Sequence, residues 1–402
     1  MKIVFISNFL NHHQLPLCLE LQRLTDNHFI FGACTPVPEE RLNMGYYDMN
    51  KQYDFVICAY ENDENKKRLL ELVEESDILI VGGLNSSVAD QYVRRHLGEG
   101  KVTYQYLERI YKRGVWRAVS PRGFRAMRKY HARYNKENVY VLCASAYTAW
   151  DLGLTRSYVN KTYKWGYFPK VNEYDVDKLI ELKRQNIKPS ILWCGRLIDW
   201  KHPELAVRVA KELKQSGYDF EMTIIGNGVL ENEIRNMISD FNLSDCVTMT
   251  GAMSPERVRD HMERANIYLF TSDFNEGWGA VLNESMNSAC AVVSSCAIGS
   301  APFLIEHGKN GYVYKKTNFP SLYKAVKELI DNQELQETFG RAAYETMIKE
   351  WSPENAAKRI IELSESLLSK KQCTEIQSGP CSVAYRISNG SMYRFVNKKN
   401  KG

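Results

Sequence analysis

Residues 267–284 read IYLFTSDFNEGWGAVLNE, which is a short apolar run, a polar loop with two glycines, and the start of a helical pattern. A short apolar run bounded by turn residues is typical of a strand that is buried on both faces. The helical pattern that follows predicts a strand–loop–helix unit, the repeating element of parallel sheets. The loop at 273–279 should therefore lie at the carboxyl end of its strand, the edge at which open parallel sheets bind ligands.

The same alternation recurs along the chain in two series. The apolar runs of the first are at 2–7, 54–60, 77–83, 101–107 and 138–145, and those of the second are at 190–196, 221–228, 246–251, 267–272, 291–295 and 311–314. Helical patterns lie between most of them, for example at 14–25, 64–75, 203–216, 230–241, 255–264 and 279–289. Two such series predict an α/β fold of two doubly wound, Rossmann-like parallel-sheet domains whose strand ends surround a shared cleft. We expect domains at 1–170 and 171–351, with 352–402 forming a helix and tail that pack back on the first.

The composition is ordinary for a soluble globular protein, since 44% of the 402 residues are hydrophobic and 25% are charged. The first apolar run ends in polar residues, unlike a secretory signal, and no run approaches the ~18 apolar residues of a spanning helix. The ten cysteines are scattered without a C-x-x-C pair, so we expect reduced core residues. These features favour a cytoplasmic protein, either free or peripheral on the inner face of the plasma membrane.

Basic residues are concentrated in 94–136, where thirteen Lys and Arg face two Glu, a net charge of +11, with aromatic residues between them. One interpretation is a solvated basic face. Another is a docking surface for an anionic membrane or a phosphorylated acceptor, because each basic residue near an anionic membrane adds about 1 kcal/mol of attraction. Nucleic acid is not favoured, because no nucleic-acid motif accompanies the segment.

The loop in NEGWGAVLNE has the groups that a nucleotide sugar requires. Gly277 and Gly279 let backbone amides approach a ligand, and the start of the following helix favours phosphate. Glu276 and Glu284 are placed to accept hydrogen bonds from sugar and ribose hydroxyls on either side of the phosphates. The alternative is a solvated loop glutamate and a helix glutamate in a surface ion pair.

Other strand ends of the second series point to the same edge. Arg196 and Lys201, in CGRLIDWK, could bind two phosphates through charge-assisted hydrogen bonds. A glycine turn at 226–228 follows the next strand, and the backbone at 252–253 could contact a base, with Ser254 as a helix cap. The donor-side residues expected in addition to those named above are Gly226, Asn227, Gly228, Ala252, Met253, Trp278 and Ala280.

These motifs together resemble a known family. The GR…K pair, the G-x-G turn, the Glu-x-Trp-Gly…Glu motif and GSAPFLIEHGKNGYVY make 190–314 similar to the nucleotide-sugar domain of retaining glycosyltransferases of the GT-B fold, family four. The N-terminal half is similar to a bacterial subgroup that makes surface polysaccharides, at SNFLNHHQLPL, YLERIYKRG and ASAYTAWDLGL…YKWGYFP. The resemblance covers most of 1–368.

The resemblance implies a retaining hexosyltransferase. Its donor would be a nucleotide-diphosphate sugar, with a UDP-sugar expected, and its acceptor a saccharide or a polyprenyl-diphosphate-linked saccharide. Arg196 and Lys201 would bind the diphosphate, Glu276 the transferred sugar and Glu284 the ribose. With cations already present we expect neither a metal nor a cofactor. Ala289 replaces a family glycine, and Glu108 stands where relatives often carry a histidine.

Acceptor-side groups are expected at the strand ends of the first domain. His13 and Glu108 are candidate acid/base or acceptor-side residues, and Asn11, His12 and Arg109 are further acceptor-side candidates. For the histidines, capping or packing is an alternative. Elsewhere, the DVD of 175–177 mimics a metal-binding D-x-D, but its place before a helical pattern favours N-capping.

Two other functions remain open. A nucleotide-sugar 2-epimerase of the same fold would bind the same donor, but the basic aromatic segment suggests an acceptor site that an epimerase lacks. A non-catalytic, transferase-like partner subunit would not need the four charged donor-side residues Arg196, Lys201, Glu276 and Glu284 together.

Overall fold

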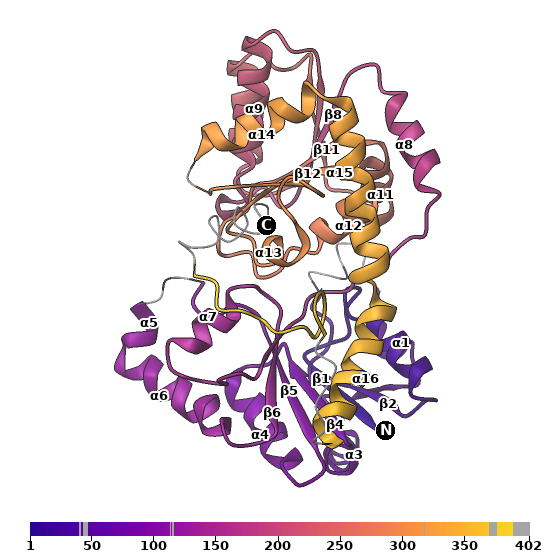
Figure 1. Cartoon of the computed structure of the whole chain (residues 1–402), viewed down its shortest axis with the longest axis vertical. Helices are drawn as coiled ribbons and strands as arrows, with labels where there is room; N and C mark the ends of the chain where they lie inside the picture. The colour runs from indigo at the N-terminus through magenta and orange to yellow at the C-terminus, as the bar shows by residue number, and fades with distance from the viewer. Residues whose placement is uncertain are drawn as a thin grey trace. The chain divides into compact units, whose positions relative to one another are not determined.

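A computed structural model describes residues 1–39, 42, 47–112, 114, 116–316, 318–369 and 376–388. The chain divides into two compact units, and each is treated by itself (Figure 1). Unit 1 comprises Met1–Lys170 and Glu350–Ile387, and unit 2 comprises Val171–Lys349. The sequence had suggested divisions after 170 and after 351. Residues 389–402 of the expected tail lie outside the described residues.

Unit 1 has a seven-stranded parallel sheet in the order β3-β2-β1-β4-β5-β6-β7. Its strands are β1 (Ile3–Ser7), β2 (Phe29–Ala33), β3 (Val56–Cys58), β4 (Ile78–Gly82), β5 (Val102–Leu107), β6 (Val139–Cys143) and β7 (Thr162–Lys164). The prediction of a parallel sheet is confirmed, and all five predicted strands are present. The sequence analysis missed two strands. One is β2, which pairs with β1 in parallel and places Phe29 opposite Ile3, and the other is the three-residue β7.

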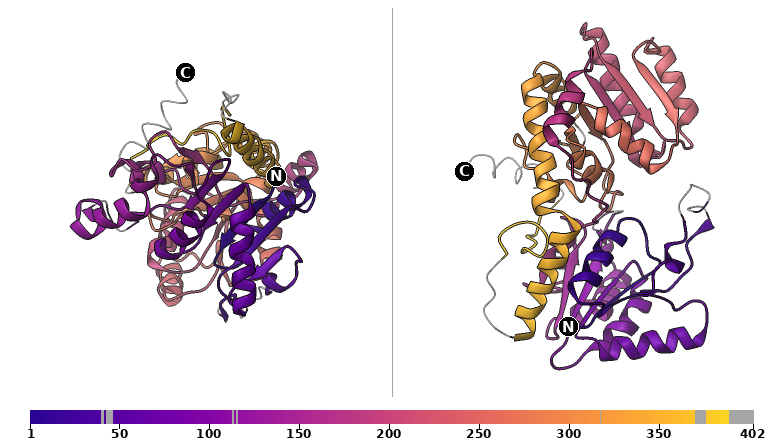
Figure 2. Two further views of the ribbon diagram at one scale, coloured as in Figure 1. Left: turned by 90° about the horizontal axis from the view of Figure 1, so that it is seen from below. Right: turned by 90° about the vertical axis from the view of Figure 1, so that its right-hand side faces the viewer.

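Helices surround the unit 1 sheet. They are α1 (Leu15–Leu24), α3 (Asp63–Glu75), α4 (Ser86–His96), α5 (Trp116–Val119), α6 (Pro121–Tyr130), α7 (Thr148–Gly153) and α16 (Pro353–Ser369), with short 3₁₀ turns η1 (Met49–Lys51) and η2 (Ala132–Tyr134). The chain returns to unit 1 for α16, which packs beside α1 (Figure 2). The Tyr104 hydroxyl of β5 lies 3.0 Å from Ser364 of α16, so a buried polar contact ties this last helix to the sheet.

The segment after α16 completes the edge of the same sheet. Tyr163 and Val383 form an antiparallel bridge. The amide of Lys164 donates to the Ser382 carbonyl at 2.7 Å, and the Ala384 amide donates to Thr162 at 3.0 Å. Residues 381–384 therefore cover β7, which would otherwise present unpaired backbone groups.

Unit 2 has a six-stranded parallel sheet in the order β10-β9-β8-β11-β12-β13. Its strands are β8 (Ser190–Cys194), β9 (Glu221–Ile225), β10 (Val247–Gly251), β11 (Ile267–Phe270), β12 (Ala291–Ser295) and β13 (Tyr312–Tyr314). All six were predicted. A core of buried residues, including Trp193, Ile224 and Val293 from the sheet and Val207 from a covering helix, lies between the sheet and that helix layer.

Helices cover the unit 2 sheet, and two of them begin at side-chain caps that the sequence predicts. They are α8 (Val176–Arg184), α9 (Pro203–Gln215), α10 (Glu231–Asp240), α11 (Pro255–Arg264), α12 (Val281–Asn287), α13 (Ala301–Leu304), α14 (Phe319–Ile330) and α15 (Gln333–Glu345), with a 3₁₀ turn η3 (Asp199–Lys201) and a π turn η4 (Thr346–Glu350). The Asp175 side chain accepts from Lys178 N at 3.3 Å and Ser254 from Arg257 N at 3.5 Å, so both predicted N-caps are confirmed. No helix in the described part of the chain is both long enough and apolar enough to cross a membrane.

Candidate functional site

Four neighbouring strands of unit 2 deliver the predicted donor-side residues to one edge. The strands β10, β9, β8 and β11 are adjacent and parallel, so the loops at their carboxyl ends lie next to one another. These loops are 252–254, 226–230, 195–202 and 271–280. This edge is where a parallel sheet of this type binds its ligand.

The central contact of the edge joins two predicted residues, Lys201 and Glu276. The Lys201 ammonium pairs with the Glu276 carboxylate, and the two side chains are only 13% and 11% exposed. The ammonium also lies 4.7 Å from the ring centroid of Trp200 and 5.7 Å from that of Phe270. A cation in this setting is shielded from water, so its attraction for an anion is stronger than at an open surface.

Arg196 supplies a second cation. Its side chain is exposed, and its guanidinium lies 5.6 Å from the Trp200 ring centroid. Trp200 thus contacts both cations and helps to fix their positions. The sequence reasoning missed Trp200, although its place between Arg196 and Lys201 was a usable signal.

Backbone contacts join the loop of Lys201 to the loop of Glu276. The Asp273 amide donates to the Trp200 carbonyl at 2.9 Å. The Thr271 hydroxyl donates to the Lys201 carbonyl at 2.7 Å and accepts from the Trp193 indole at 2.8 Å. The two loops are therefore linked on both sides of Lys201.

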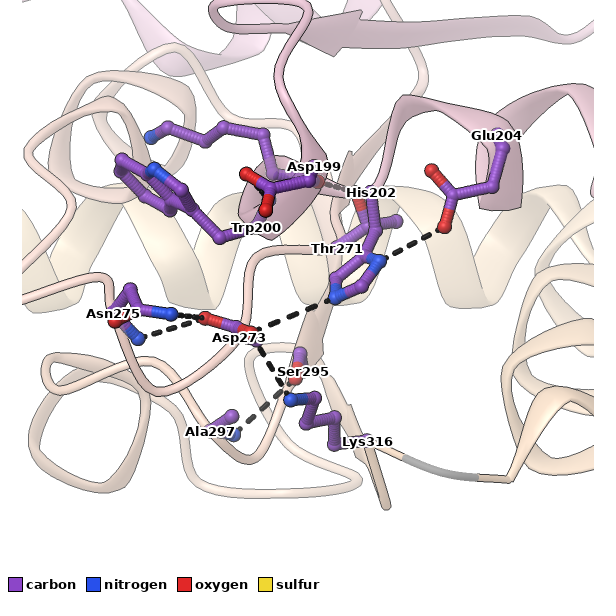
Figure 3. Close-up of polar contacts among 11 residues, drawn as sticks. Asp199, Trp200, His202, Glu204, Thr271, Asp273, Asn275, Ser295, Ala297 and Lys316 are labelled. Atoms are coloured by element: carbon purple, nitrogen blue, oxygen red, sulfur yellow. Dashed lines mark hydrogen bonds and ion pairs between the residues drawn. The ribbon is translucent and has the colours of Figure 1, made fainter. Parts of the chain in front are cut away.

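The same two loops carry part of a group of four ionisable side chains, His202, Glu204, Asp273 and Lys316 (Figure 3). His202 Nδ1 is 2.8 Å from Glu204 Oε1, and its Nε2 is 3.8 Å from Asp273 Oδ2. Asp273 also accepts from Lys316 Nζ at 3.1 Å. The nearby carboxylate of Asp273 and then the hydrogen-bonded carboxylate of Glu204 raise the pKa of His202 to about 9. Burial raises the pKa of Asp273, but the contact with His202 and the hydrogen bonds from the Asn275 amide and Lys316 outweigh burial and hold the pKa below its usual range.

Glu284 lies on α12, close to the end of β8. Burial raises the pKa of its carboxyl, and the positive charge of Arg259 opposes the rise. Cys194 is the last residue of β8. Burial raises the pKa of its thiol to about 12, and the negative charge of the nearby Glu284 carboxylate contributes to the rise. Arg259 donates to the Glu284 carbonyl at 2.9 Å and to Asn287 at 3.0 Å, so it holds the end of α12 in place.

The predicted glycines and their neighbours have several different roles. A Cβ on Gly279, whose φ is +86°, would lie 2.5 Å from the Phe270 ring, so the turn before α12 requires glycine. Trp278 is 1% exposed and its indole donates to Asn283 at 2.8 Å, which leaves only its backbone for a ligand. Gly277 lies between Glu276 and Trp278, and Ala280 is the cap residue of α12.

The remaining donor-side residues lie on the loops after β9 and β10. Asn227 and Ala252 are exposed and Met253 is half-buried. A Cβ on Gly226 or Gly228 would lie 1.9 Å from the Gly195 carbonyl or 2.3 Å from the Leu197 carbonyl, respectively. These glycines thus let the loop that carries Arg196 pack tightly on its neighbour.

In unit 1, two predicted residues are linked through one that was missed. The Tyr167 hydroxyl donates to Glu108, and the Tyr167 ring stacks on His13 with centroids 5.3 Å apart. Lys112 donates to the other oxygen of Glu108 at 2.6 Å. His13 and Glu108 therefore belong to one polar cluster, connected by Tyr167.

Asn11 and His12 lie on the turn that starts α1. The Asn11 side chain accepts from the His13 amide at 3.0 Å and donates to Gln14 at 2.9 Å. The ring centroids of His12 and His13 are 3.6 Å apart. Asn11 thus organises the turn that presents both histidines.

Arg109 lies in the interior of unit 1. Its side chain is 1% exposed, with Nε 3.8 Å from Asp151 Oδ2 and its guanidinium 4.8 Å from the Tyr147 ring centroid. Asp151 also accepts from the amides of Ile110 and Tyr111 at 2.9 Å each. Burial lowers the pKa of Arg109 and raises that of Asp151, and the attraction between them opposes both shifts. This arrangement favours a role in fixing the loop after β5 over direct contact with an acceptor.

Residues 178–346 match the family model described as glycosyl transferases group 1. This segment includes the whole donor-side edge. The amylovoran biosynthesis glycosyltransferase AmsK of Erwinia amylovora is 31% identical over 182 residues, 44% of this chain and 44% of the relative. The N-acetylgalactosamine-N,N'-diacetylbacillosaminyl-diphospho-undecaprenol 4-alpha-N-acetylgalactosaminyltransferase of Campylobacter jejuni is 29% identical over 153 residues, 38% of this chain and 40% of the relative. The chain spans less than half the length of these relatives.

Solved structures establish the fold class over most of the chain. A crystal structure of HepE from Anabaena in complex with UDP has a TM-score of 0.65 at 15% identity, covering 91% of this chain and 100% of that one. The likeness, together with the two parallel sheets, confirms the predicted GT-B fold of two Rossmann-like units.

Proposed function

We propose that the chain is a glycosyltransferase that moves a sugar from a nucleotide-diphosphate donor to a saccharide or lipid-linked saccharide in polysaccharide or glycoconjugate synthesis. The observation that carries this proposal is the shielded Lys201–Glu276 pair, with Arg196 beside it, at the carboxyl edge of the unit 2 sheet. The similarity of this segment to glycosyltransferases supports it.

The proposed donor complex follows from the charges at this edge. A diphosphate that approaches Lys201 competes with Glu276 for the ammonium. Once Lys201 and Arg196 bind the phosphates, Glu276 is released to accept hydrogen bonds from the hydroxyls of the transferred sugar. Glu284, on the other side, accepts from the ribose. As the bond to the sugar breaks, negative charge grows on the departing diphosphate, and the two cations stabilise that charge.

The proposal includes a UDP-sugar donor and retention of anomeric configuration. The fold neighbour HepE was solved with UDP, and the motifs of 190–314 resemble family four, whose members retain configuration. In such a reaction the donor phosphate oxygen accepts the proton of the acceptor hydroxyl, and the protein supplies positioning and charge. Since Arg196 and Lys201 supply the positive charge, the proposal requires no metal or cofactor.

The acceptor side of the proposal rests on the cluster of His13, Tyr167 and Glu108 at the strand ends of unit 1. These groups offer hydrogen-bond donors and acceptors for a saccharide. The name of the Campylobacter relative describes a diphospho-undecaprenol-linked saccharide. A polyprenyl-diphosphate-linked saccharide is therefore our proposed acceptor class.

A donor library tests the proposal. The protein is incubated with individual nucleotide sugars and a polyprenyl-diphosphate-linked saccharide, and the products are identified by mass spectrometry and by the anomeric signal in NMR. We expect one sugar added with retention, and no product from Glu276→Gln. An epimer formed without acceptor would instead indicate an epimerase. Failure of every nucleoside diphosphate to bind in titration calorimetry would indicate a non-catalytic subunit.

We further propose that α5 and α6 dock on an anionic membrane surface. Between 109 and 136 the chain has ten Lys and Arg and no Asp or Glu. On α6, Arg122, Arg125, Arg128 and Lys129 are exposed, and α6 buries only Met127. Trp116 and Phe124 are 63% and 45% exposed. A basic helix with exposed aromatic residues suits the interface of an anionic bilayer.

Vesicle sedimentation tests this surface. We expect the protein to pellet with phosphatidylglycerol vesicles at low salt and to be released at high salt, because exposed charges are screened. Arg122→Glu with Arg125→Glu should abolish pelleting. The matched control is Lys66→Glu with Lys67→Glu, which reverses the same number of exposed charges on α3. Equal loss in both variants, or pelleting that salt does not change, would contradict the proposal.

A further inference from the structure

His202 has a left-handed backbone conformation, which few non-glycine residues adopt. Its φ and ψ are both +53°, in the left-handed region, where it is the residue between η3 and α9. A non-glycine residue in this region is strained, and such residues cluster at functional sites. The backbone of His202 therefore directs attention to its imidazole.

Both ring nitrogens of His202 face carboxylates (Figure 3). Nδ1 is 2.8 Å from Glu204 and Nε2 is 3.8 Å from Asp273. The Glu204 contact is a hydrogen bond, whereas the Asp273 contact is an ion pair at a longer distance. Negative charge beside both ring nitrogens favours the cation, and the pKa of His202, raised to about 9 first by Asp273 and then by Glu204, agrees with this geometry.

The imidazole connects two loops that carry the proposed donor-binding groups. Lys201 immediately precedes His202. On the other loop, the Glu276 amide donates to the Asp273 carbonyl at 3.0 Å, so Asp273 starts the turn that ends at Glu276. The ionisable groups around the imidazole come from three elements: Glu204 from α9, Asp273 from the loop after β11, and Lys316 from the segment after β13. The Tyr314 hydroxyl lies near Glu204.

We propose that His202, as the imidazolium, is a positioning residue. It holds the 199–202 segment against the 271–276 loop, so that Lys201 and Glu276 are both in place to contact the donor. This inference rests on the proposed function, since it assigns a role within the same site. His202 itself need not touch the donor. Its loss lets the two loops separate and lowers the affinity for the diphosphate.

The pH dependence of UDP binding distinguishes positioning by the cation from simple packing. Calorimetric titrations with UDP are run from about pH 6 to pH 10 at constant ionic strength. We expect wild-type affinity to be level up to about pH 8 and to weaken as pH rises through about 9, where His202 loses its proton. His202→Gln should bind UDP about tenfold more weakly at pH 7 and lack the step near 9. Asp273→Asn should move the step to lower pH, and the control His261→Gln, on α11, should match wild type.

A second measurement does not depend on any nucleotide. In protein labelled with ¹³C-histidine, NMR follows the titration of the His202 ring, and hydrogen exchange follows the peptide that covers 271–280. We expect titration near 9 in wild type and faster exchange of this peptide in His202→Gln. Titration near the usual 6.5 with unchanged exchange would overturn the inference.

The two experiments separate the inference from the proposed function. Equal UDP affinity and equal pH profiles for wild type and His202→Gln would overturn the positioning role while leaving donor binding intact. A different outcome is that wild-type protein binds no nucleoside diphosphate and still shows the raised His202 titration and slow hydrogen exchange in 271–280. That result would overturn the proposed function and support the role of His202 in holding the two loops together. If His202→Gln fails to fold, Asp273→Asn provides the same comparison.

Discussion

At the scale of single residues, the proposed chemistry depends on how opposite charges are arranged in a partly buried setting. Lys201 and Glu276 neutralise each other, while Arg196 beside them is exposed. A mutual pair holds both side chains in fixed positions before a ligand arrives, which lowers the cost of ordering them on binding. The two glutamates of the edge differ, because the Glu276 carboxylate pairs with Lys201, whereas Glu284 is half-buried and the pKa of its carboxyl is raised by desolvation.

This difference predicts different kinetic effects for the two glutamates. Glu276→Gln should lower kcat by about 100-fold or more, because it removes a group proposed to act on the transferred sugar. Glu284→Gln should mainly raise the donor KM, by about tenfold, since one charge-assisted hydrogen bond contributes ~1.5–3 kcal/mol. Steady-state kinetics with varied donor measures both. Glu233→Gln, exposed on α10, is the control, and a kcat unchanged in Glu276→Gln would remove our assignment.

His202 also predicts a pH dependence of stability. Its folded pKa of about 9 lies above the usual 6.5, so its stabilising contribution is complete below about 6.5 and is lost as pH rises through 9. The shift corresponds to about 3 kcal/mol. Urea unfolding at pH 6 and pH 10 should show a larger stability difference between wild type and His202→Gln at the lower pH. A difference that is constant with pH would indicate that His202 acts only by packing.

The buried pair of Arg109 and Asp151 predicts a loss of stability. Asp151→Ala removes the partner of a buried cation and the acceptor of two backbone amides, so it should lower the free energy of unfolding by about 3–5 kcal/mol. In a double-mutant cycle, Asp151→Ala with Arg109→Met should cost less than the sum of the single changes. Urea denaturation provides the measurement. Arg109→Met that leaves stability intact but raises the acceptor KM would instead support the original acceptor-side assignment.

At the scale of elements, tight contact between neighbouring strand ends shapes the donor edge. The loop after β8 packs on the loop after β9, with the Leu197 amide donating to the Asn227 carbonyl at 2.8 Å and the Leu230 amide donating back to Leu197 at 3.0 Å. Gly226 and Gly228, with φ of +138° and +156°, make this approach possible. The G-x-G turn thus determines where Arg196 lies.

Alanine at these glycines should disturb both stability and donor binding. Gly226→Ala or Gly228→Ala places a methyl group against a backbone carbonyl, so each should cost about 2–4 kcal/mol and weaken UDP binding as the Arg196 loop shifts. Gly217→Ala is the matched control, because Gly217 has a φ of +80° but nothing within 4 Å of its Cβ position. It should cost only about 1 kcal/mol and leave UDP binding unchanged. Thermal unfolding and calorimetry measure these effects.

The end of α12 shows how the chain accommodates a departure from the pattern of the family that its motifs resemble. Ala289 has a φ of +52°, and the Cys290 amide donates to the Ser285 carbonyl at 3.1 Å, as at a helix end closed by a left-handed residue. The family glycine would adopt this conformation without strain. The Ala289 methyl compensates in part, because it is buried in a cluster with Leu179, Ile180 and Tyr344.

At the scale of the whole molecule, unit 1 depends on chain segments from both ends of the sequence. The helix α16 packs on α1, and residues 381–384 cover β7. Arg359 of α16 donates to the Ser378 carbonyl, which ties this segment to the helix. The last part of the described chain is therefore structural for a unit that begins at residue 1.

Truncation after residue 369 should accordingly destabilise unit 1. It exposes the edge of β7 and removes the buried side chains Cys381, Ala384 and Ile387. We expect a lower melting temperature and faster hydrogen exchange in β6 and β7, with exchange in the unit 2 strands unchanged. Truncation after residue 388 is the control and should retain wild-type protection. Equal protection in both truncated chains would show that the covering segment contributes little.

Much of the architecture follows from local sequence. Apolar runs of four to eight residues predicted eleven strands at their observed places, because burial on both faces leaves a continuous apolar signal. The strand β2 was missed although FIFGA is as apolar as the predicted ILIVG of β4, and β7 was missed because TYK is too short to show a pattern. Capping residues such as Asp175 and Ser254 were predicted because the cap bond is local.

The candidate site was predicted only in part, and the limit is also physical. The sequence by itself determined which residues follow each strand, and hence that Arg196, Lys201, Glu276 and Glu284 belong to one edge of a parallel sheet. Only the tertiary structure decided the partners, because β8 and β11 are neighbours in space although more than seventy residues separate them. That neighbourhood pairs Lys201 with Glu276 and places His202 beside Asp273, whereas packing buries Trp278 and Arg109. Strand order and side-chain packing depend on the whole core, and no local pattern records them.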